Sequence, residues 1–176
     1  MKEKIVDLFL KKEGFIHKNL ELKKNNQKGF FFISNKEIKK DTILINVPKK
    51  LLISVDQIKN LKNFNNEFEK KYFDILVKNS QYLKTHPLNC KVNEFNKIIE
   101  VLKNNENLKR NFEVLYEKYN LLNNEEKLIK LLELTRSIFL NKFQKSFFMP
   151  IMDFVNHDEY GSNYLLSDNS DVYIKS

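Results

Sequence analysis

Apolar and polar positions repeat with two different periods along this chain, and the period changes twice. Residues 3–12 place apolar side chains at helical spacing, and Gly14 just after them is a typical helix stop. The spacing then shortens. Leu20 and Leu22 alternate with polar residues, and the runs FFFIS and ILINV follow, separated by the turn sequences NNQKG and NKEIKKDT. The pattern predicts one helix and then several short strands.

Helical periodicity dominates the middle of the chain. Ser54 and Gln57 have capping-box spacing, which predicts that a helical block begins there. The last predicted helix is the longest and runs from about Glu125 to Phe143. Each predicted helix has one apolar face: Phe68, Tyr72, Ile75 and Leu76; Phe95, Ile98, Ile99 and Leu102; Leu108, Phe112, Leu115, Tyr116 and Tyr119; Leu128, Leu131, Leu132, Thr135, Ile138 and Phe139.

A strand-like pattern returns near the end of the sequence. The runs PIMDFV and DVYIK are rich in apolar residues and lie on either side of the turn sequence around Gly161. Strands, then helices, then strands again are typical of an α+β fold in which a helical block interrupts a β-rich unit. We therefore divide the chain at 1–54, 55–145 and 146–176, and expect the first and last parts to share one sheet system.

The composition fits a globular protein with its own core. The chain has 176 residues, 41% of them hydrophobic, and no apolar run approaches the length needed to cross a bilayer. Its one cysteine, Cys90, excludes an internal disulfide framework and fits a reducing compartment. We therefore expect an intracellular protein without a membrane partner, located in the cytoplasm, with the nucleus as the alternative.

The net charge of +8, from 31 Lys and Arg against 23 Asp and Glu, raises the question of a nucleic-acid partner. The lysines are dispersed, however, and Arg110 and Arg136 are the only arginines in the sequence. A solvated lysine surface therefore explains the charge better than a nucleic-acid interface, and acidic partners stay open. A nucleic-acid binder would show a steep salt dependence of binding.

The segment MPIMDFVNHDEYGSN concentrates the candidate chemistry. Asp153, His157, Asp158 and Glu159 offer ligands for a divalent ion, and an extended segment would put Asp153 and His157 on one strand face. No second His or Cys cluster lies nearby, which counts against a metal site. The plain structural alternative is a turn in which Asn156 and His157 satisfy backbone groups. The sequence has no phosphate-binding loop and no nucleophile-elbow motif.

Three groups of motifs, in this order along the chain, resemble SET-domain methyltransferases. The similarity is greatest to the group typified by the Rubisco large-subunit methyltransferase, in which a helical insertion divides the SET domain. The motifs are a glycine-led opening and its following strand, a Ser/Thr-Arg pair that ends the insertion, and the pattern P-x-x-D-x-x-N-H. They correspond here to Gly29, residues 35–40, ILINV and Pro48; to Thr135 and Arg136; and to Pro150, Asp153, Asn156 and His157.

The resemblance implies a SET domain split by a helical insertion, with S-adenosyl-L-methionine as the cofactor. It implies that Arg136 pairs with the carboxylate of the cofactor, whereas a salt bridge to Glu133 or to the nearby strands is the structural alternative. Phe31 stands where the family has its second glycine, which normally lets the backbone approach the cofactor closely. The implied cofactor-binding residues are Gly29, Phe31, Arg136, Asp153, Asn156 and His157.

The implied activity is N-methylation of a protein, with lysine as the preferred acceptor and histidine as the alternative. Methyl transfer needs positioning and a desolvated channel rather than a metal ion. The family's catalytic Tyr, in a Tyr-Gly pair, has no counterpart at the matching place, so we assign no catalytic residue. Tyr160-Gly161 precedes the last strand and is not given that role. We expect the parent gene to continue beyond Ser176 and to encode such a pair.

The helical insertion is expected to form one wall of the substrate groove, with a basic surface that favours acidic targets. A second hypothesis, from a different class, is a SET-like protein-interaction module without catalysis. Titration with the cofactor separates the two hypotheses, because only the enzyme requires tight cofactor binding.

Overall fold

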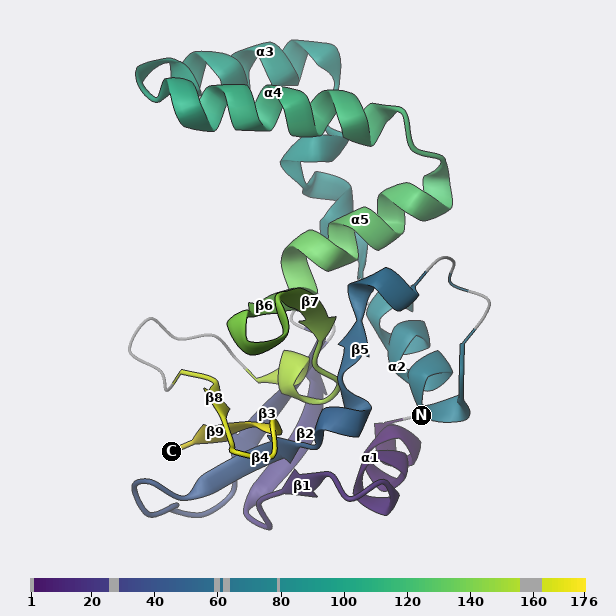
Figure 1. Ribbon diagram of the computed structural model, residues 1–176, viewed down its shortest axis with the longest axis vertical. Helices are drawn as coiled ribbons and strands as arrows, with labels where there is room; N and C mark the ends of the chain where they lie inside the picture. The colour runs from purple at the N-terminus through teal and green to yellow at the C-terminus, as the bar shows by residue number, and fades with distance from the viewer. Residues whose placement is uncertain (1, 26–28, 59–60, 62–63, 79, 156–162) are drawn as a thin grey trace.

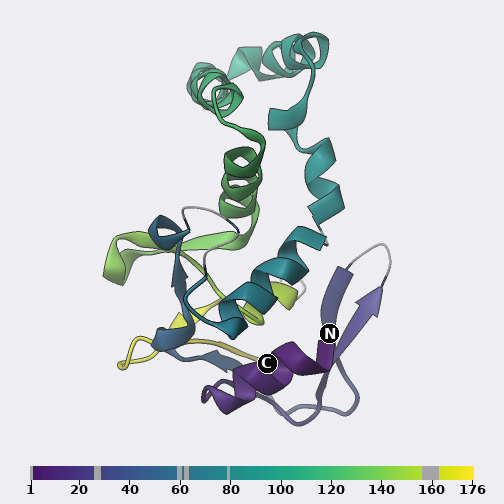
Figure 2. The ribbon, with the colours of Figure 1, turned by 90° about the vertical axis from the view of Figure 1, so that its right-hand side faces the viewer.

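The computed structural model describes residues 2–25, 29–58, 61, 64–78, 80–155 and 163–176. Strands from both ends of the sequence lie together in the lower part of Figure 1. Three helices form an arm that projects from this strand-rich part: α3 (Val92–Val101), α4 (Glu106–Asn120) and α5 (Asn124–Arg136). Figure 2 shows the same separation after a 90° turn, with α1 (Lys2–Lys11) and α2 (Glu67–Lys78) beside the strands.

The first helix ends where the sequence predicts. Ile5 and Phe9 of α1 are fully buried, and the Phe9 ring lies beside Phe68 of α2 with the ring centroids 6.2 Å apart. Glu13 adopts a φ of 67°, and the Gly14 N–H donates to the Phe9 carbonyl at 3.0 Å. A Cβ at Gly14 would lie 2.4 Å from the Phe9 ring. Glycine is therefore required, because the chain passes directly over a buried aromatic ring.

An antiparallel sheet joins the first and last parts of the chain. It consists of four strands in the order β1-β4-β9-β8: β1 (Phe15–Ile16), β4 (Ile43–Val47), β9 (Val172–Lys175) and β8 (Leu165–Leu166). Val47 of β4 lies opposite Val172 of β9, and both side chains are fully buried. The two strand-rich parts of the sequence do share one sheet.

Two smaller sheets complete the strand-rich part. β2 (Leu20–Asn25) and β3 (Gly29–Ser34) form an antiparallel hairpin, as the alternating pattern predicts. The third sheet has the order β5-β7-β6, with β5 (Ile53–Ser54), β7 (Lys145–Phe148) and β6 (Ser137–Leu140). Ile53 lies opposite Phe148 in this sheet, so residues on both sides of the helical insertion are again paired.

The predicted apolar faces of the helices differ in burial: that of α2 lies in the core, whereas those of α3 and α4 are mostly only half-buried. On α2 the whole predicted stripe is in the core, and Phe73 on the same helix meets Phe148 of β7 edge to face at 5.1 Å. α5 begins with a capping box, in which Asn123 and Glu126 exchange side-chain-to-backbone hydrogen bonds. None of the helices in the described part of the chain is both long and apolar enough to cross a membrane.

Short 3-10 helices connect these elements. They are η1 (Lys49–Leu51), η2 (Val55–Gln57), η3 (Ser80–Thr85), η4 (Pro87–Asn89), η5 (Leu102–Asn104), η6 (Asn141–Phe143) and η7 (Met152–Phe154). Of these, η7 is functionally the most informative, because it carries one of the candidate site residues.

Two predicted helix boundaries are wrong. Ser54 does not cap a helix: it is buried in β5, only η2 follows, and its hydroxyl has no hydrogen-bond partner among the described residues. The last helix does not reach Phe143, because Ser137–Leu140 leaves it to pair with β7. Aromatic and β-branched residues suit a strand, and pairing with the run KSFF outweighs the local helical period.

Replacing Gly14 with alanine should destabilise the protein by about 1–3 kcal/mol, because the new methyl group would overlap the buried Phe9 ring. Urea denaturation of Gly14→Ala against the wild type measures the loss. Asp7→Ala, at an exposed position of α1, is the matched control. Equal stability of Gly14→Ala and the wild type would show that the Phe9 ring can shift at no cost.

Candidate functional site

The segment after β7 does not continue as a strand. Its expected extended form is wrong: Ile151 adopts a φ of 73°, and η7 follows. Pro150 cannot donate to a strand ladder, and the backbone turns back on itself instead. The Asp153 N–H donates to the Met149 carbonyl (3.2 Å), and the Val155 N–H donates to the Met152 carbonyl (2.9 Å). Asp153 therefore belongs to a tight turn, and the expectation that it shares a strand face with His157 does not hold.

Asp153 is a buried carboxylate held by two other segments. Its side chain is 8% exposed, between the buried residues Met152 and Phe154. The Tyr72 hydroxyl on α2 donates to Asp153 Oδ2, and Arg136 Nη1 at the end of α5 donates to the Asp153 carbonyl oxygen at 3.0 Å. These contacts bring together three segments that are far apart in the sequence. The predicted residues Arg136 and Asp153 are therefore neighbours.

Burial raises the pKa of Asp153 from an ordinary value of 3.8 to about 7. The Tyr72 hydrogen bond and the positive charge of Arg136 act in the opposite direction but do not cancel the desolvation. A substantial fraction of the Asp153 carboxyl is therefore neutral near pH 7.

Tyr72 and Tyr164 belong to the site, although the motif comparison did not include them. Burial raises the pKa of the Tyr164 phenol, the Asp153 charge adds to this, and the charge of Arg136 opposes it. Tyr164 therefore lies within electrostatic reach of both charged residues. One feature of the sequence could have identified Tyr72: a tyrosine on a buried helical stripe needs a partner for its hydroxyl.

Glu133, the alternative partner of Arg136, forms a salt bridge with another residue. Glu133 Oε2 lies 3.0 Å from Lys130 Nζ one turn earlier on α5. The Ser137 hydroxyl donates to the Glu133 carbonyl at 2.8 Å, and the Thr135 hydroxyl donates to the Leu131 carbonyl at 2.7 Å. These hydrogen bonds lie in the last turn of α5, from which the Arg136 side chain extends to η7.

The hairpin strand β3 reaches the same site. The Phe30 ring packs on Phe154 of η7, with the ring centroids 5.5 Å apart. Successive side chains on a strand point to opposite faces, so Phe31 lies on the other face of β3. Its cross-strand partner Lys23 shares that face, whereas Phe32 faces the buried Leu22. The bulky Phe31 side chain therefore does not occupy the space between β3 and η7.

The remaining predicted site residues lie at the end of the hairpin or outside the described residues. Gly29 opens β3 opposite Asn25, at the end of the hairpin. Asn156 and His157 lie outside the described residues, as do Asp158 and Glu159 of the alternative metal site. The structure thus brings together Arg136, Asp153 and the strand β3, and the cofactor-binding roles of these residues remain predictions.

The sequence matches no protein-family model and no curated protein sequence. Its fold, in contrast, is similar to that of solved SET-domain structures. The SET domain of LSMT bound to methyl-lysine and AdoHcy aligns with a TM-score of 0.58 and 17% identity, and Rubisco LSMT bound to AdoMet aligns with 0.55 and 16%. The SET domain of LSMT bound to lysine and AdoHcy gives 0.51 and 13%.

These alignments cover 99% of this chain but only 49–50% of each solved chain. The chain therefore has the α+β fold of a SET domain over its whole length and spans about half the length of these structures. At such low identity the likeness concerns the fold, and the chemistry must be argued from the residues of this chain.

The buried carboxylate predicts a specific pH dependence of stability. Between about pH 4 and pH 7 the folded protein holds a proton on Asp153 that the unfolded chain has released. The contribution of Asp153 to the free energy of unfolding should therefore fall as the pH rises through this range and stay level above it. Asp153→Asn removes this dependence. The melting temperature of Asp153→Asn minus that of the wild type should therefore be roughly 5–10 °C higher at pH 7.5 than at pH 4.

Thermal melts at several pH values measure this difference. Asp7→Asn, at an exposed position of α1, is the matched control and should leave the profile of the wild type unchanged. A constant difference between Asp153→Asn and the wild type across the range would mean that Asp153 ionises normally in the folded protein.

Proposed function

We propose that this protein is an S-adenosyl-L-methionine-dependent protein N-methyltransferase, with lysine as the preferred acceptor and histidine as the alternative. The observation that carries the proposal is the SET-domain fold over 99% of the chain, shared with structures bound to AdoMet, or to AdoHcy with lysine or methyl-lysine. A fold alone does not define a reaction. The proposal therefore also depends on whether the residues at the site suit this cofactor.

The charge at the site suits a ligand that carries a carboxylate. Arg136 is half-buried and fixed at the end of α5, and its neighbour Asp153 is partly protonated at neutral pH. A guanidinium binds a carboxylate through strong charge-assisted hydrogen bonds. Arg136 would hold the amino-acid end of the cofactor in this way.

The surroundings of Arg136 suit a reaction that needs a dry site. Met152 and Phe154 are buried on η7, and Phe30 of β3 packs against Phe154. S-adenosyl-L-methionine, when bound, supplies a methyl group activated on a sulfonium. The residues of this chain would exclude water and fix the orientation of the bound molecules, which is what methyl transfer requires of a protein. The segment containing Asn156 and His157 follows η7 directly and is proposed to complete the pocket.

One observation favours the second candidate, a protein-interaction module without catalysis. The arm exposes large aliphatic side chains on α3 and at the end of α4, including Val101 (80% exposed) and Leu121 (87% exposed). Exposed apolar side chains of this size are common where proteins contact one another. The module does not require cofactor binding, so a binding experiment separates the two candidates.

Arg136→Gln should weaken AdoHcy binding about 10–100-fold, because a charge-assisted hydrogen bond in a half-buried site is lost. Isothermal titration calorimetry measures the affinity. The second arginine offers a matched control: Arg110 is exposed on α4, and Arg110→Gln should bind like the wild type. Circular dichroism checks that Arg136→Gln is folded, since Arg136 also holds the Asp153 carbonyl. Failure of the wild type to bind AdoHcy would favour the interaction module.

Because no catalytic residue is assigned in residues 1–176, the acceptor is identified with a version of the protein that includes the expected Tyr-Gly pair. This protein and a protein extract are incubated with S-adenosyl-L-methionine that carries a labelled methyl group. Hydrolysis of the labelled proteins should yield methyl-lysine, and Arg136→Gln should reduce the incorporation while Arg110→Gln does not. Labelled methyl-histidine would keep the reaction class but replace the preferred acceptor. Absence of incorporation, with AdoHcy binding intact, would contradict the methyltransferase proposal.

A further inference from the structure

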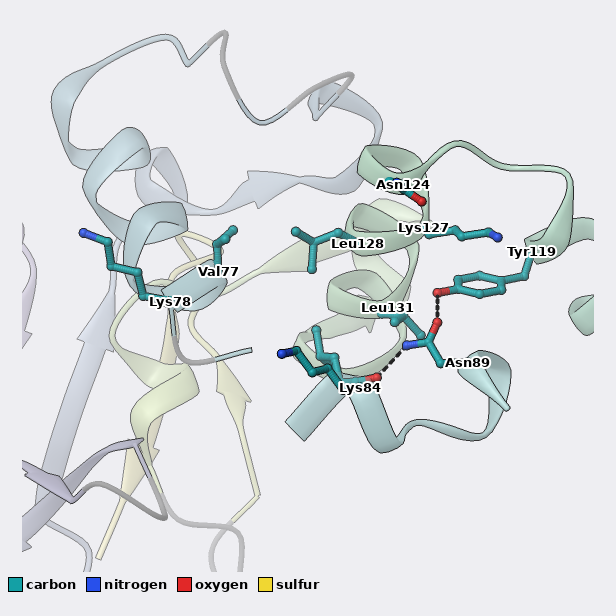
Figure 3. Close-up of a pocket in the computed structure, with 10 residues that line it drawn as sticks. Val77, Lys78, Lys84, Asn89, Tyr119, Asn124, Lys127, Leu128 and Leu131 are labelled. Atoms are coloured by element: carbon teal, nitrogen blue, oxygen red, sulfur yellow. Dashed lines mark hydrogen bonds between the residues drawn. The ribbon is translucent and has the colours of Figure 1, made fainter. Parts of the chain in front are cut away.

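A groove on the arm lies apart from the Arg136 site. It has a volume of about 420 Å³ and is formed between the end of α2, η3 and η4 on one side and the ends of α4 and α5 on the other (Figure 3). Residues 124, 127, 128 and 131 of α5 line it at helical spacings of three and four, so one face of that helix forms a wall. This volume is in the range of pockets that hold small ligands or single side chains.

The floor of the groove is aliphatic and rigid. Figure 3 shows Val77 on the α2 side and Leu128 and Leu131 on the α5 side. Two hydrogen bonds fix the wall next to them. The Tyr119 hydroxyl donates to Asn89 Oδ1 at 2.5 Å, and Asn89 Nδ2 donates to the Leu83 carbonyl at 2.7 Å. A preformed apolar floor of this kind suits an aliphatic side chain, because little ordering is needed on binding.

The charge around the groove is positive. Its lining includes the lysines Lys78, Lys84 and Lys127, and none of its described lining residues is acidic. Neither Lys84 nor Lys127 forms a salt bridge with a described carboxylate. The two carboxylates in the first turn of α5 are engaged elsewhere: Glu125 accepts the Leu61 N–H (2.6 Å), and Glu126 accepts the Asn123 N–H (2.9 Å).

These features favour an acidic protein segment over a nucleic acid. Single-stranded nucleic acids are held by exposed aromatic rings and by arginines. The one aromatic ring described in the lining, that of Tyr119, is 2% exposed, and Lys127 Nζ lies 5.4 Å from its centroid. No arginine lines the groove. We propose that this groove binds an acidic segment of a partner protein, which inserts an aliphatic side chain between α2 and α5 and places carboxylates beside Lys84 and Lys127.

The groove has a geometric relation to the Arg136 site. α5 begins at the groove with Asn124 and ends with Arg136, and a helix of this length spans about 20 Å. A segment bound in the groove would therefore keep its protein within a short reach of the site. This role as a second anchoring site for the methyl acceptor depends on the proposed function, whereas binding in the groove does not.

Fluorescence anisotropy with a fluorescein-labelled peptide of Glu-Glu-Leu repeats tests the binding. The peptide should bind the wild type, and binding should weaken as salt is added. Peptides of Ser-Ser-Leu and Glu-Glu-Ser repeats should each bind about tenfold more weakly, because one lacks the charge and the other the aliphatic anchor. The Glu-Glu-Ser comparison uses the wild-type protein, so it does not depend on the folding of any variant.

Charge reversal locates the binding. Lys84→Glu combined with Lys127→Glu should weaken the Glu-Glu-Leu peptide at least about tenfold, since like charges then face each other. Lys97→Glu combined with Lys103→Glu changes the net charge equally on exposed positions outside the groove and should have little effect. Glutamate at position 127 is compatible with the helix, because acidic residues are favoured near a helix N-terminus. Melting curves confirm that both pairs of variants are folded.

Three outcomes would overturn the proposal. The first is that the Glu-Glu-Leu peptide does not bind, and the second is that both pairs of charge reversals weaken its binding equally. The third is that a single-stranded oligonucleotide binds more tightly than the peptide and only the reversal of Lys84 and Lys127 weakens its binding. The assay contains no cofactor and measures no methyl transfer. Its failure would therefore leave the proposed function untouched, and a failure of AdoHcy binding would leave the groove untouched.

Discussion

Asp153, in the turn after β7, links both ends of the helical block to the strand-rich part. Asp153 accepts the hydroxyl of Tyr72 from α2, near the start of the insertion, and its carbonyl accepts Arg136 from α5, at the end. Burying a carboxyl group is costly unless its hydrogen bonds are made, and the Tyr72 hydroxyl supplies one of them. The orientation of the arm, and with it the position of the groove on α5, depends on these contacts.

The same constraint prepares the candidate cofactor site. Desolvation raises the pKa of the Asp153 carboxyl, and the half-buried Arg136 guanidinium beside it donates to the Asp153 carbonyl. The Phe30 ring of β3 packs against Phe154 of η7, so the strand that begins with glycine also borders the site. A cationic side chain, a strand that begins with glycine and an apolar boundary thus lie together, although they come from three parts of the sequence.

Local patterns in the sequence were sufficient to predict some elements but predicted others wrongly. The stop at Gly14 and the β2–β3 hairpin follow from neighbouring residues and could be predicted. The boundaries at Ser54 and at 137–143 could not, because pairing with β7 determines them. Asp153 was expected on a strand, but the turn that contains it depends on backbone bonds that no periodicity reveals. Tyr72 was predicted only as a core residue, since its partner lies 81 positions away.

We infer that β3, the end of α5 and η7 together form a site for S-adenosyl-L-methionine. Hydrogen–deuterium exchange with and without AdoHcy tests it most directly, because exchange reports local protection along the whole backbone. If the site is correct, exchange should be slower on AdoHcy binding in 29–34, 135–137 and 149–155, with α3 and α4 unchanged. Unchanged exchange in all three segments, at AdoHcy concentrations that saturate binding, would contradict it.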